Sequence, residues 1–270
     1  MGRRAGRVAL VTGAARGIGA ATVRALAAQG WAVLAVDLCA DDPALPYRLG
    51  RPDELDQVVA GARAAAGDPD AVHALVADVC QWDQMIEAVA LAERLWGGLD
   101  AAVAVAGVIA GGVPLWEMPA DQQRAVLDTD LGGVINLARA AIPALLRRPE
   151  PRSGRFLAVA SAAATRGLPM LAAYCAAKAG VTGLIRALAV ELGGTGVTAN
   201  AVSPGSTDTP ILAESARLYG LPGASAFAAQ QPVQRLLAPD EVAAALAWLA
   251  GEATGGITGA VVPVDGGLAL

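Results

Sequence analysis

Short, almost continuous apolar runs alternate with longer helical patterns along the whole chain. Runs such as Ala32–Asp37 and Gly154–Ala160 do not alternate apolar with polar residues, which is typical of strands buried on both faces of a parallel sheet. Repeated β–α alternation without a strong linker predicts one doubly wound α/β domain over residues 1–270. We expect a Rossmann-type, mostly parallel, seven-stranded sheet with helices on both faces.

The apolar runs and the helical patterns give the expected strands and helices. Strands are expected at Arg7–Thr12, Ala32–Asp37, Val72–Ala77, Leu99–Ala106, Gly154–Ala160, Val197–Val202 and Ala260–Val264. Helices are expected at Gly17–Gln29, Pro52–Ala66, Gln81–Trp96, Pro119–Arg147, Leu171–Leu192 and Pro239–Ala250. Two segments interrupt the alternation of strands and helices, Leu38–Arg51 and Ser206–Pro232. Both follow strands, and open α/β sheets bind ligands beyond the carboxyl ends of their strands. Both are therefore expected to have a function, the second as a mobile lid over the substrate.

Composition argues against several classes of protein. A formal net charge of −5 and a pI near 4.9 are unlike a nucleic-acid-binding surface. Cys39, Cys80, Cys175 and the single His73 have no metal-site spacing, so no metal is expected, and the odd number of cysteines fits free thiols in a reducing cytosol.

No targeting or membrane segment is expected. Arg3, Arg4 and Arg7 precede only four apolar residues, too few for a signal peptide. The longest apolar stretch, Ala101–Trp116, is broken by glycine and proline and is shorter than the ~20 residues of a membrane span. We expect a cytoplasmic protein without membrane contact.

A glycine-rich turn joins the first expected strand to the first expected helix. Gly13, Gly17 and Gly19 follow the pattern T-G-x-x-x-G-x-G, a variant of the dinucleotide fingerprint. Glycine lets the backbone approach a pyrophosphate closely, and a helix N-terminus offers free N–H groups to it. The turn, including Arg16 and Ile18, predicts a nucleotide site.

Two aspartates that follow strands extend this site. A carboxylate at Asp37 can accept hydrogen bonds from an adenosine ribose and would repel a 2′-phosphate, which predicts NAD over NADP. Arg16 favours the opposite choice weakly, and Asp37 has the alternative role of a strand-end cap. Asp78 and the N–H of Val79 can bracket the adenine edge, with a plain turn aspartate as the alternative.

Tyr174 and Lys178 stand four residues apart on an expected helix, with Ser161 thirteen residues before Tyr174. Positions i and i+4 share a helix face, so the ammonium can lie beside the phenol. A neighbouring positive charge lowers the pKa of a tyrosine from its usual value of about 10. The pair is therefore expected to serve as a general acid–base group.

These motifs together resemble the short-chain dehydrogenase/reductase family over nearly the whole chain. They occur in the order Thr12-Gly13-x-x-x-Gly17-x-Gly19, Asp37, Asp78-Val79, Ala106-Gly107, Ser161, Tyr174-x-x-x-Lys178 and Pro204-Gly205-x-x-x-Thr209. The resemblance implies NAD-dependent interconversion of a secondary alcohol and a ketone by hydride transfer.

The resemblance also implies a role for each residue. Tyr174 exchanges the proton with the substrate, Ser161 hydrogen-bonds the same oxygen, and Lys178 holds the nicotinamide ribose and lowers the Tyr174 pKa. Backbone at Ala106 and Gly107 contacts the cofactor. The segment Pro204, Gly205, Thr207 and Thr209 holds the nicotinamide carboxamide.

Two positions depart from the family pattern. Ala104-Val105-Ala106-Gly107 stands where Asn-Asn-Ala-Gly is common, so side-chain bonding that steadies the strand is expected to be lost. Asp130 occupies the place of the fourth catalytic residue, usually an asparagine that holds a water of a proton relay. An aspartate is expected to keep that role through its backbone carbonyl.

About ten extra residues after Asp37 suggest a narrower resemblance. With the surroundings of Tyr174 and Pro204, they resemble the mycofactocin-associated subgroup, which includes carveol-dehydrogenase-like enzymes. For that subgroup the extra segment implies a tightly held NAD that an external redox partner, such as mycofactocin, recycles in place. The alternative is a tolerated surface loop.

The substrate is expected to be a small apolar secondary alcohol or ketone, because Ser206–Pro232 is rich in Ala, Leu, Tyr and Phe. Two alternatives remain: an NADPH-dependent 3-oxoacyl thioester reductase, which Asp37 argues against, and a non-catalytic NAD-binding sensor. The family resemblance further implies a homotetramer that pairs the helices Pro119–Arg147 and Leu171–Leu192.

Overall fold

A computed structural model describes residues 6–270, so Arg3 and Arg4 lie outside the described residues. The strands are β1 (Val8–Thr12), β2 (Ala32–Asp37), β3 (Val72–Val76), β4 (Ala101–Ala104), β5 (Arg155–Val159), β6 (Thr198–Pro204) and β7 (Val261–Val264). The α-helices are α1 (Gly17–Ala28), α2 (Pro52–Ala66), α3 (Trp82–Trp96), α4 (Ala120–Leu127), α5 (Gly133–Leu146), α6 (Ala172–Glu191), α7 (Pro210–Leu218) and α8 (Pro239–Ala250).

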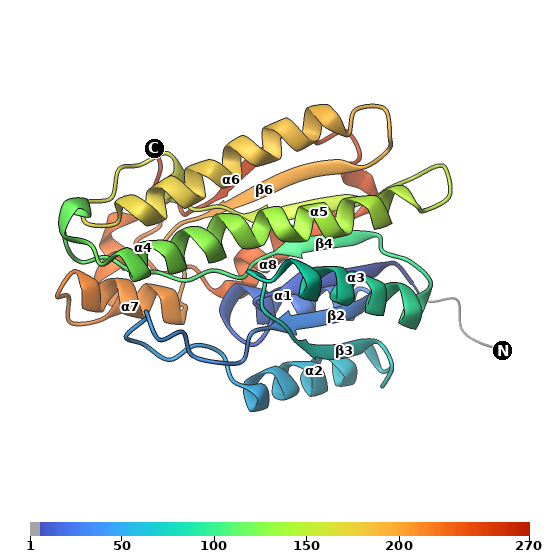
Figure 1. The fold of residues 1–270 in the computed structure, drawn as a ribbon, viewed down its shortest axis with the longest axis horizontal. Coiled ribbons are helices and arrows are strands. Elements are labelled where there is room, and N and C mark those ends of the chain that lie inside the picture. The colour runs from blue at the N-terminus through green and yellow to red at the C-terminus, as the bar shows by residue number, and fades with distance from the viewer. Residues whose placement is uncertain (1–5) are drawn as a thin grey trace.

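The seven strands form one sheet in the order β3-β2-β1-β4-β5-β6-β7, and every pairing is parallel. The strand order reverses direction between β1 and β4, where a doubly wound sheet opens a crevice at its carboxyl edge. Figure 1 shows helices lying along the sheet. The predicted seven-stranded doubly wound fold is confirmed.

Two hydrophobic layers enclose the sheet. On one face, apolar side chains of α3, α5 and α6 pack against the strands, with Phe156 and Leu137 fully buried. On the other face, α1, α2 and α8 do the same around Leu26 and Leu246. Burying both faces explains why the central strands read as continuous apolar runs.

The edge strands differ from the expectation. In β3 only Val72 is buried and the other residues are half-buried or exposed, with Val76 58% exposed, and β7 is only partly buried. An edge strand has a neighbour on one side only, so less of it is covered. The prediction that all strands are buried on both faces is wrong for these two.

The long helix expected at Pro119–Arg147 is interrupted. A π-helical turn at Asp128–Gly132 separates α4 from α5. Such turns insert an extra residue into a helix and often occur at functional sites. Pro143 lies within α5.

Helix α6 is the one helix in residues 6–270 that is long and apolar enough to cross a membrane by length and composition, with a mean hydropathy of 1.3. Core helices pass the same test. This helix contacts β6 and carries the buried Lys178.

Candidate functional site

A cavity of about 780 Å³ lies beyond the carboxyl ends of the strands. Every predicted site residue except Asp130 lines it, namely Gly13, Arg16, Gly17, Ile18, Gly19, Asp37, Asp78, Val79, Ala106, Gly107, Ser161, Tyr174, Lys178, Pro204, Gly205, Thr207 and Thr209. Asp130 is fully buried behind Lys178. Residues separated by almost 200 positions thus meet in one crevice.

The glycine turn leaves no room for side chains. Gly13 has a φ of +67°, and a Cβ there would lie 2.7 Å from the backbone of Ala106. A Cβ on Gly19 would lie 1.9 Å from the carbonyl oxygen of Gly13. Helix α1 starts at Gly17 without a side-chain cap, so its first N–H groups are free to bind an anion. The site therefore fits the pyrophosphate of a dinucleotide.

Thr12 steadies the turn from the neighbouring strand. Its hydroxyl accepts hydrogen bonds from the N–H groups of Val105, at 3.2 Å, and Ala106, at 3.3 Å. Thr12 is buried, so these bonds are shielded from water. The side-chain support expected to be lost with the missing asparagines comes instead from Thr12, which sequence reasoning overlooked.

Asp37 is both a strand-end cap and part of the cavity wall. One carboxylate oxygen accepts from Ala15 N–H at 2.9 Å, and the other accepts from Cys39 N–H at 3.1 Å. The Arg16 guanidinium donates to the carbonyl oxygen of Arg48 at 3.1 Å, so this cation is bound to the extra segment. The Asp37 carboxylate therefore lies in the cavity wall while it also caps the end of β2.

The turn after β3 is held by its own bonds. Asp78 accepts from Cys80 N–H at 2.8 Å, which is the turn role considered as an alternative, while its side chain also lines the cavity. The amide of Asn136 donates to the carbonyl oxygen of Val79 at 2.9 Å. Asn136 fixes the position of Val79, and the sequence carried no signal for it.

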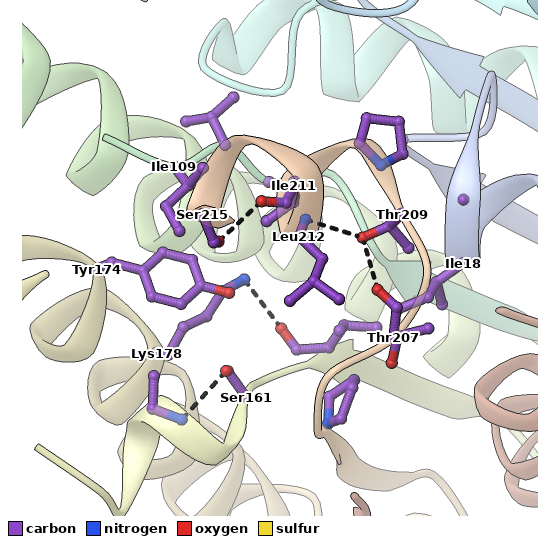
Figure 2. A pocket seen from close by; sticks show the side chains of 18 of the residues that line it. Ile18, Ile109, Ser161, Tyr174, Lys178, Thr207, Thr209, Ile211, Leu212 and Ser215 are labelled. Carbon is purple, nitrogen blue, oxygen red and sulfur yellow. Dashed lines mark hydrogen bonds between the residues drawn. The ribbon is translucent and has the colours of Figure 1, made fainter. Parts of the chain in front are cut away.

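Tyr174, Lys178 and Ser161 lie on one wall of the cavity, opposite the segment with Thr207 and Leu212 (Figure 2). The Lys178 ammonium lies 5.6 Å from the centre of the Tyr174 ring, as expected for an i and i+4 pair. Ser161 follows β5, and its hydroxyl accepts from Ala163 N–H at 3.1 Å. The structure brings the predicted trio together.

Lys178 is buried and has two partners. Its ammonium donates to the carbonyl oxygen of Val159 at 3.2 Å and lies 3.2 Å from a carboxylate oxygen of Asp130. The other oxygen of Asp130 accepts from Val108 N–H at 2.7 Å. The π-helical turn brings Asp130 to this position between α4 and α5.

The expected net lowering of the Tyr174 pKa is wrong for this arrangement. Burial raises the pKa of the phenol most strongly, Lys178 lowers it, Asp130 raises it, and Ser161 lowers it again, with a raised pKa as the result. The sequence argument included the ammonium but neither the burial nor the carboxylate beside it. Burial lowers the pKa of Lys178 most strongly, but Asp130 and Tyr174 together outweigh it, so this pKa is also raised.

The extra segment, residues 38–51, spans the crevice. At one end Arg48 binds Arg16 of the glycine turn, and Leu49 and Gly50 line the cavity. At the other, the Tyr47 hydroxyl accepts from Ile109 N–H at 2.9 Å, and Tyr47 packs in a cluster with Tyr174. In Figure 1 the segment between β2 and α2 reaches toward α7. It is an ordered part of the site, and Tyr47 was not predicted.

The segment expected to be a lid contains a helix that the sequence did not reveal. Thr209 caps α7 by accepting from Leu212 N–H at 3.3 Å, so its hydroxyl serves the helix in this structure. Apolar side chains of the segment, including Ile211 and Leu212, face the cavity together with Phe227. This part of the cavity wall therefore carries several apolar side chains.

The family comparison agrees with this geometry. Residues 13–269 match the protein family described as Enoyl-(Acyl carrier protein) reductase, which is a family of short-chain dehydrogenases. The chain belongs to the short-chain dehydrogenase/reductase family. This confirms the predicted family and identifies the protein as one of its oxidoreductases.

Individual members extend the comparison. A cis-4-hydroxycyclohexanecarboxylate dehydrogenase of Sinomonas cyclohexanicum is 40% identical over 97% of this chain and 96% of its own length. A 3-oxoacyl-[acyl-carrier-protein] reductase of Thermotoga maritima is 33% identical over 98% of each chain. The structure of carveol dehydrogenase from Mycobacterium avium, in complex with NAD, has a TM-score of 0.90 and 30% identity over 99% of each chain. A relative solved with NAD agrees with the predicted cofactor.

Proposed function

We propose that this short-chain dehydrogenase/reductase interconverts an apolar cyclic secondary alcohol and its ketone with NAD. The observation that carries the proposal is the placement of Tyr174, Lys178 and Ser161 on the wall of one cavity whose far end is apolar. Relatives named for hydroxycyclohexanecarboxylate and for carveol support a ring alcohol. In this proposal the residues around Gly13 and Asp37 bind NAD.

The residues divide the chemistry of alcohol oxidation. Bound NAD supplies the acceptor for the hydride that leaves the carbinol carbon. Tyr174 accepts the hydroxyl proton, Ser161 holds the same oxygen, and the charge of Lys178 favours the phenolate. The products are the ketone, the reduced cofactor and one proton. Ketone reduction uses the same groups in reverse.

The alternative of an acyl thioester reductase using NADPH has support from the Thermotoga maritima relative. The Asp37 carboxylate argues against it, because a 2′-phosphate beside that charge is repelled. We expect turnover with NADH to exceed turnover with NADPH. A preference for NADPH would favour the thioester reductase.

We further propose that the extra segment holds NAD tightly and that a partner such as mycofactocin reoxidises it in place. The support is its attachment on both sides of the crevice, at Arg16 and at Ile109. Release of a dinucleotide requires these contacts to open. Purified protein is expected to retain NAD through gel filtration and to release it on denaturation. Loss of the cofactor during filtration would contradict tight binding.

The proposed reaction is tested by replacing Tyr174 with Phe and screening secondary ring alcohols with an artificial electron acceptor, with and without added NAD. We expect the variant to lose turnover and to keep NAD binding, because only the proton acceptor is removed. A variant as active as the parent would reject the mechanism. Absence of turnover in the parent, with NAD bound, would favour the non-catalytic sensor.

We propose a cytoplasmic homotetramer assembled through α4, α5 and α6. The glycine and alanine residues of α6 permit close helix packing, and Val190 on this helix is 83% exposed. Sedimentation analysis tests this assembly, and a monomer would contradict it.

A further inference from the structure

The contacts of Asp130 suit a carboxylate better than the amide that the family resemblance leads one to expect here. One oxygen accepts from Val108 N–H at 2.7 Å, and the other faces the Lys178 ammonium at 3.2 Å. Both neighbours are donors, and both oxygens of a carboxylate are acceptors. An asparagine would turn its NH₂ group toward one of the two donors. The local geometry is thus complementary to a negative charge.

The pair is almost completely buried at the cavity wall. Asp130 is 0% and Lys178 3% exposed. A Cβ on Gly107 would lie 3.4 Å from both carboxylate oxygens and from the ammonium, so the backbone of Gly107 covers the pair. In such a place a lone charge is costly and is compensated by a partner. The carboxylate oxygen that faces Lys178 accepts no hydrogen bond within the described residues, so the ammonium is its only polar neighbour there.

We propose that Asp130 is a positioning residue, the buried counter-ion of Lys178, and that it moves the pH range in which Tyr174 accepts a proton upward. The inference rests on the proposed function for the role of Tyr174, and it concerns this chain's departure from asparagine. Burial raises the pKa of the Asp130 carboxyl, whereas Lys178 and the Val108 N–H lower it. With Asp130 ionised, Asp130 and Lys178 form a pair with no net charge. An ammonium so paired stabilises the phenolate less than one facing an amide.

The titratable and charged groups around the phenol come from several elements, and Tyr47 of the extra segment packs in the same cluster. Lys178 and Cys175 come from its own helix, Asp130 from the π-helical turn, and Ser161 from the segment after β5. Burial raises the pKa of Tyr174 most strongly; among the charged groups, Lys178 lowers it and Asp130 raises it. Removing the negative charge must therefore lower this pKa.

The decisive experiment needs no substrate. Tyrosinate absorbance is titrated with pH in the parent, in Asp130→Asn and in each protein carrying Tyr174→Phe as well. The difference within each pair isolates the Tyr174 phenol among the three tyrosines of the chain. We expect Asp130→Asn to lower its midpoint by about 1 unit or more. An unchanged or higher midpoint would overturn the proposal.

The matched control is Asp128→Asn, the same change on an exposed residue of the same π-helical turn. This variant is expected to titrate like the parent. An equal shift in both variants would show a general charge effect and would overturn the specific role of Asp130.

A second measurement applies even if Asp130→Asn folds poorly. That variant leaves the Lys178 charge buried without its counter-ion, which is destabilising. The double variant Asp130→Asn with Lys178→Met removes both charges and is expected to be more stable to urea than Asp130→Asn alone. A double variant no more stable than the single one would overturn the counter-ion role. Both tests are independent of turnover, so they can fail or succeed separately from the proposed reaction.

Discussion

The hydroxyl of Tyr47 accepts a hydrogen bond from the backbone N–H of Ile109 at 2.9 Å, which ties the extra segment to the wall of the catalytic cavity. Ile109 is 2% exposed and follows Val108, whose N–H binds Asp130. One short stretch of backbone is therefore held by the extra segment through Ile109 and by the buried carboxylate through Val108.

Replacing Tyr47 with Phe leaves the Ile109 N–H without its partner. An unsatisfied buried donor costs about 1–3 kcal/mol, so we expect the free energy of unfolding to fall by that amount. NAD should also dissociate faster, because the segment loses one of its attachments. Urea unfolding and stopped-flow displacement of NAD measure the two effects. Tyr219→Phe is the control, since its hydroxyl bonds an exposed carbonyl, and an equal loss there would contradict the argument.

Replacing Thr12 with Val removes the acceptor for two backbone donors, Val105 N–H and Ala106 N–H. We expect a loss of about 1–3 kcal/mol in stability and weaker NAD binding, because the turn beside Gly13 loosens. Thr22→Val is the matched control. Its buried hydroxyl donates to the Ile18 carbonyl within α1, so its loss should cost less. Calorimetric titration with NAD and urea unfolding report both quantities, and similar losses for the two variants would speak against the role of Thr12.

Replacing Gly13 with Ala places a Cβ 2.7 Å from the Ala106 backbone at a φ of +67°. Gly67→Ala is a close control, with a φ of +66° and nothing within 4 Å. Gly67→Ala should lose only the ~1–2 kcal/mol of stability that a side chain costs in the left-handed backbone region. Gly13→Ala should lose more stability and most of its NAD binding. Equal thermal shifts with intact NAD binding would show that the turn is not tightly packed.

Replacing Asp37 with Asn removes the charge that disfavours a 2′-phosphate. We expect the NADH-to-NADPH ratio of kcat/KM to fall by about tenfold or more, equivalent to about 1.4 kcal/mol. Asp42→Asn removes a carboxylate from the same cavity wall and should leave the ratio unchanged. An unaltered ratio in Asp37→Asn would assign specificity to another group.

Much of the site was predictable because it depends on local patterns. The glycine turn, Asp37 and the Tyr174–Lys178 pair each occupy fixed places relative to a strand or helix, so their arrangement follows from the order of elements. The helix α7 was missed, since Pro210–Leu218 is short and follows an irregular polar stretch. The boundary of β4 was placed too late, because hydrogen bonds to Thr12 and not hydrophobicity hold Val105 and Ala106.

The contacts of Tyr47 and Asp130 could not be predicted from local spacing in the sequence. The sequence by itself determined the parallel α/β fold, the dinucleotide turn and the identity of the phenol and ammonium, because each depends on contacts within about one helix turn or one strand–helix unit. Only the tertiary structure decided that Tyr47 anchors to Ile109 and that Asp130 faces Lys178. The residues of these two pairs lie 62 and 48 positions apart in the chain. The strength of the charge interaction between Asp130 and Lys178 depends on their burial, which only the folded chain determines.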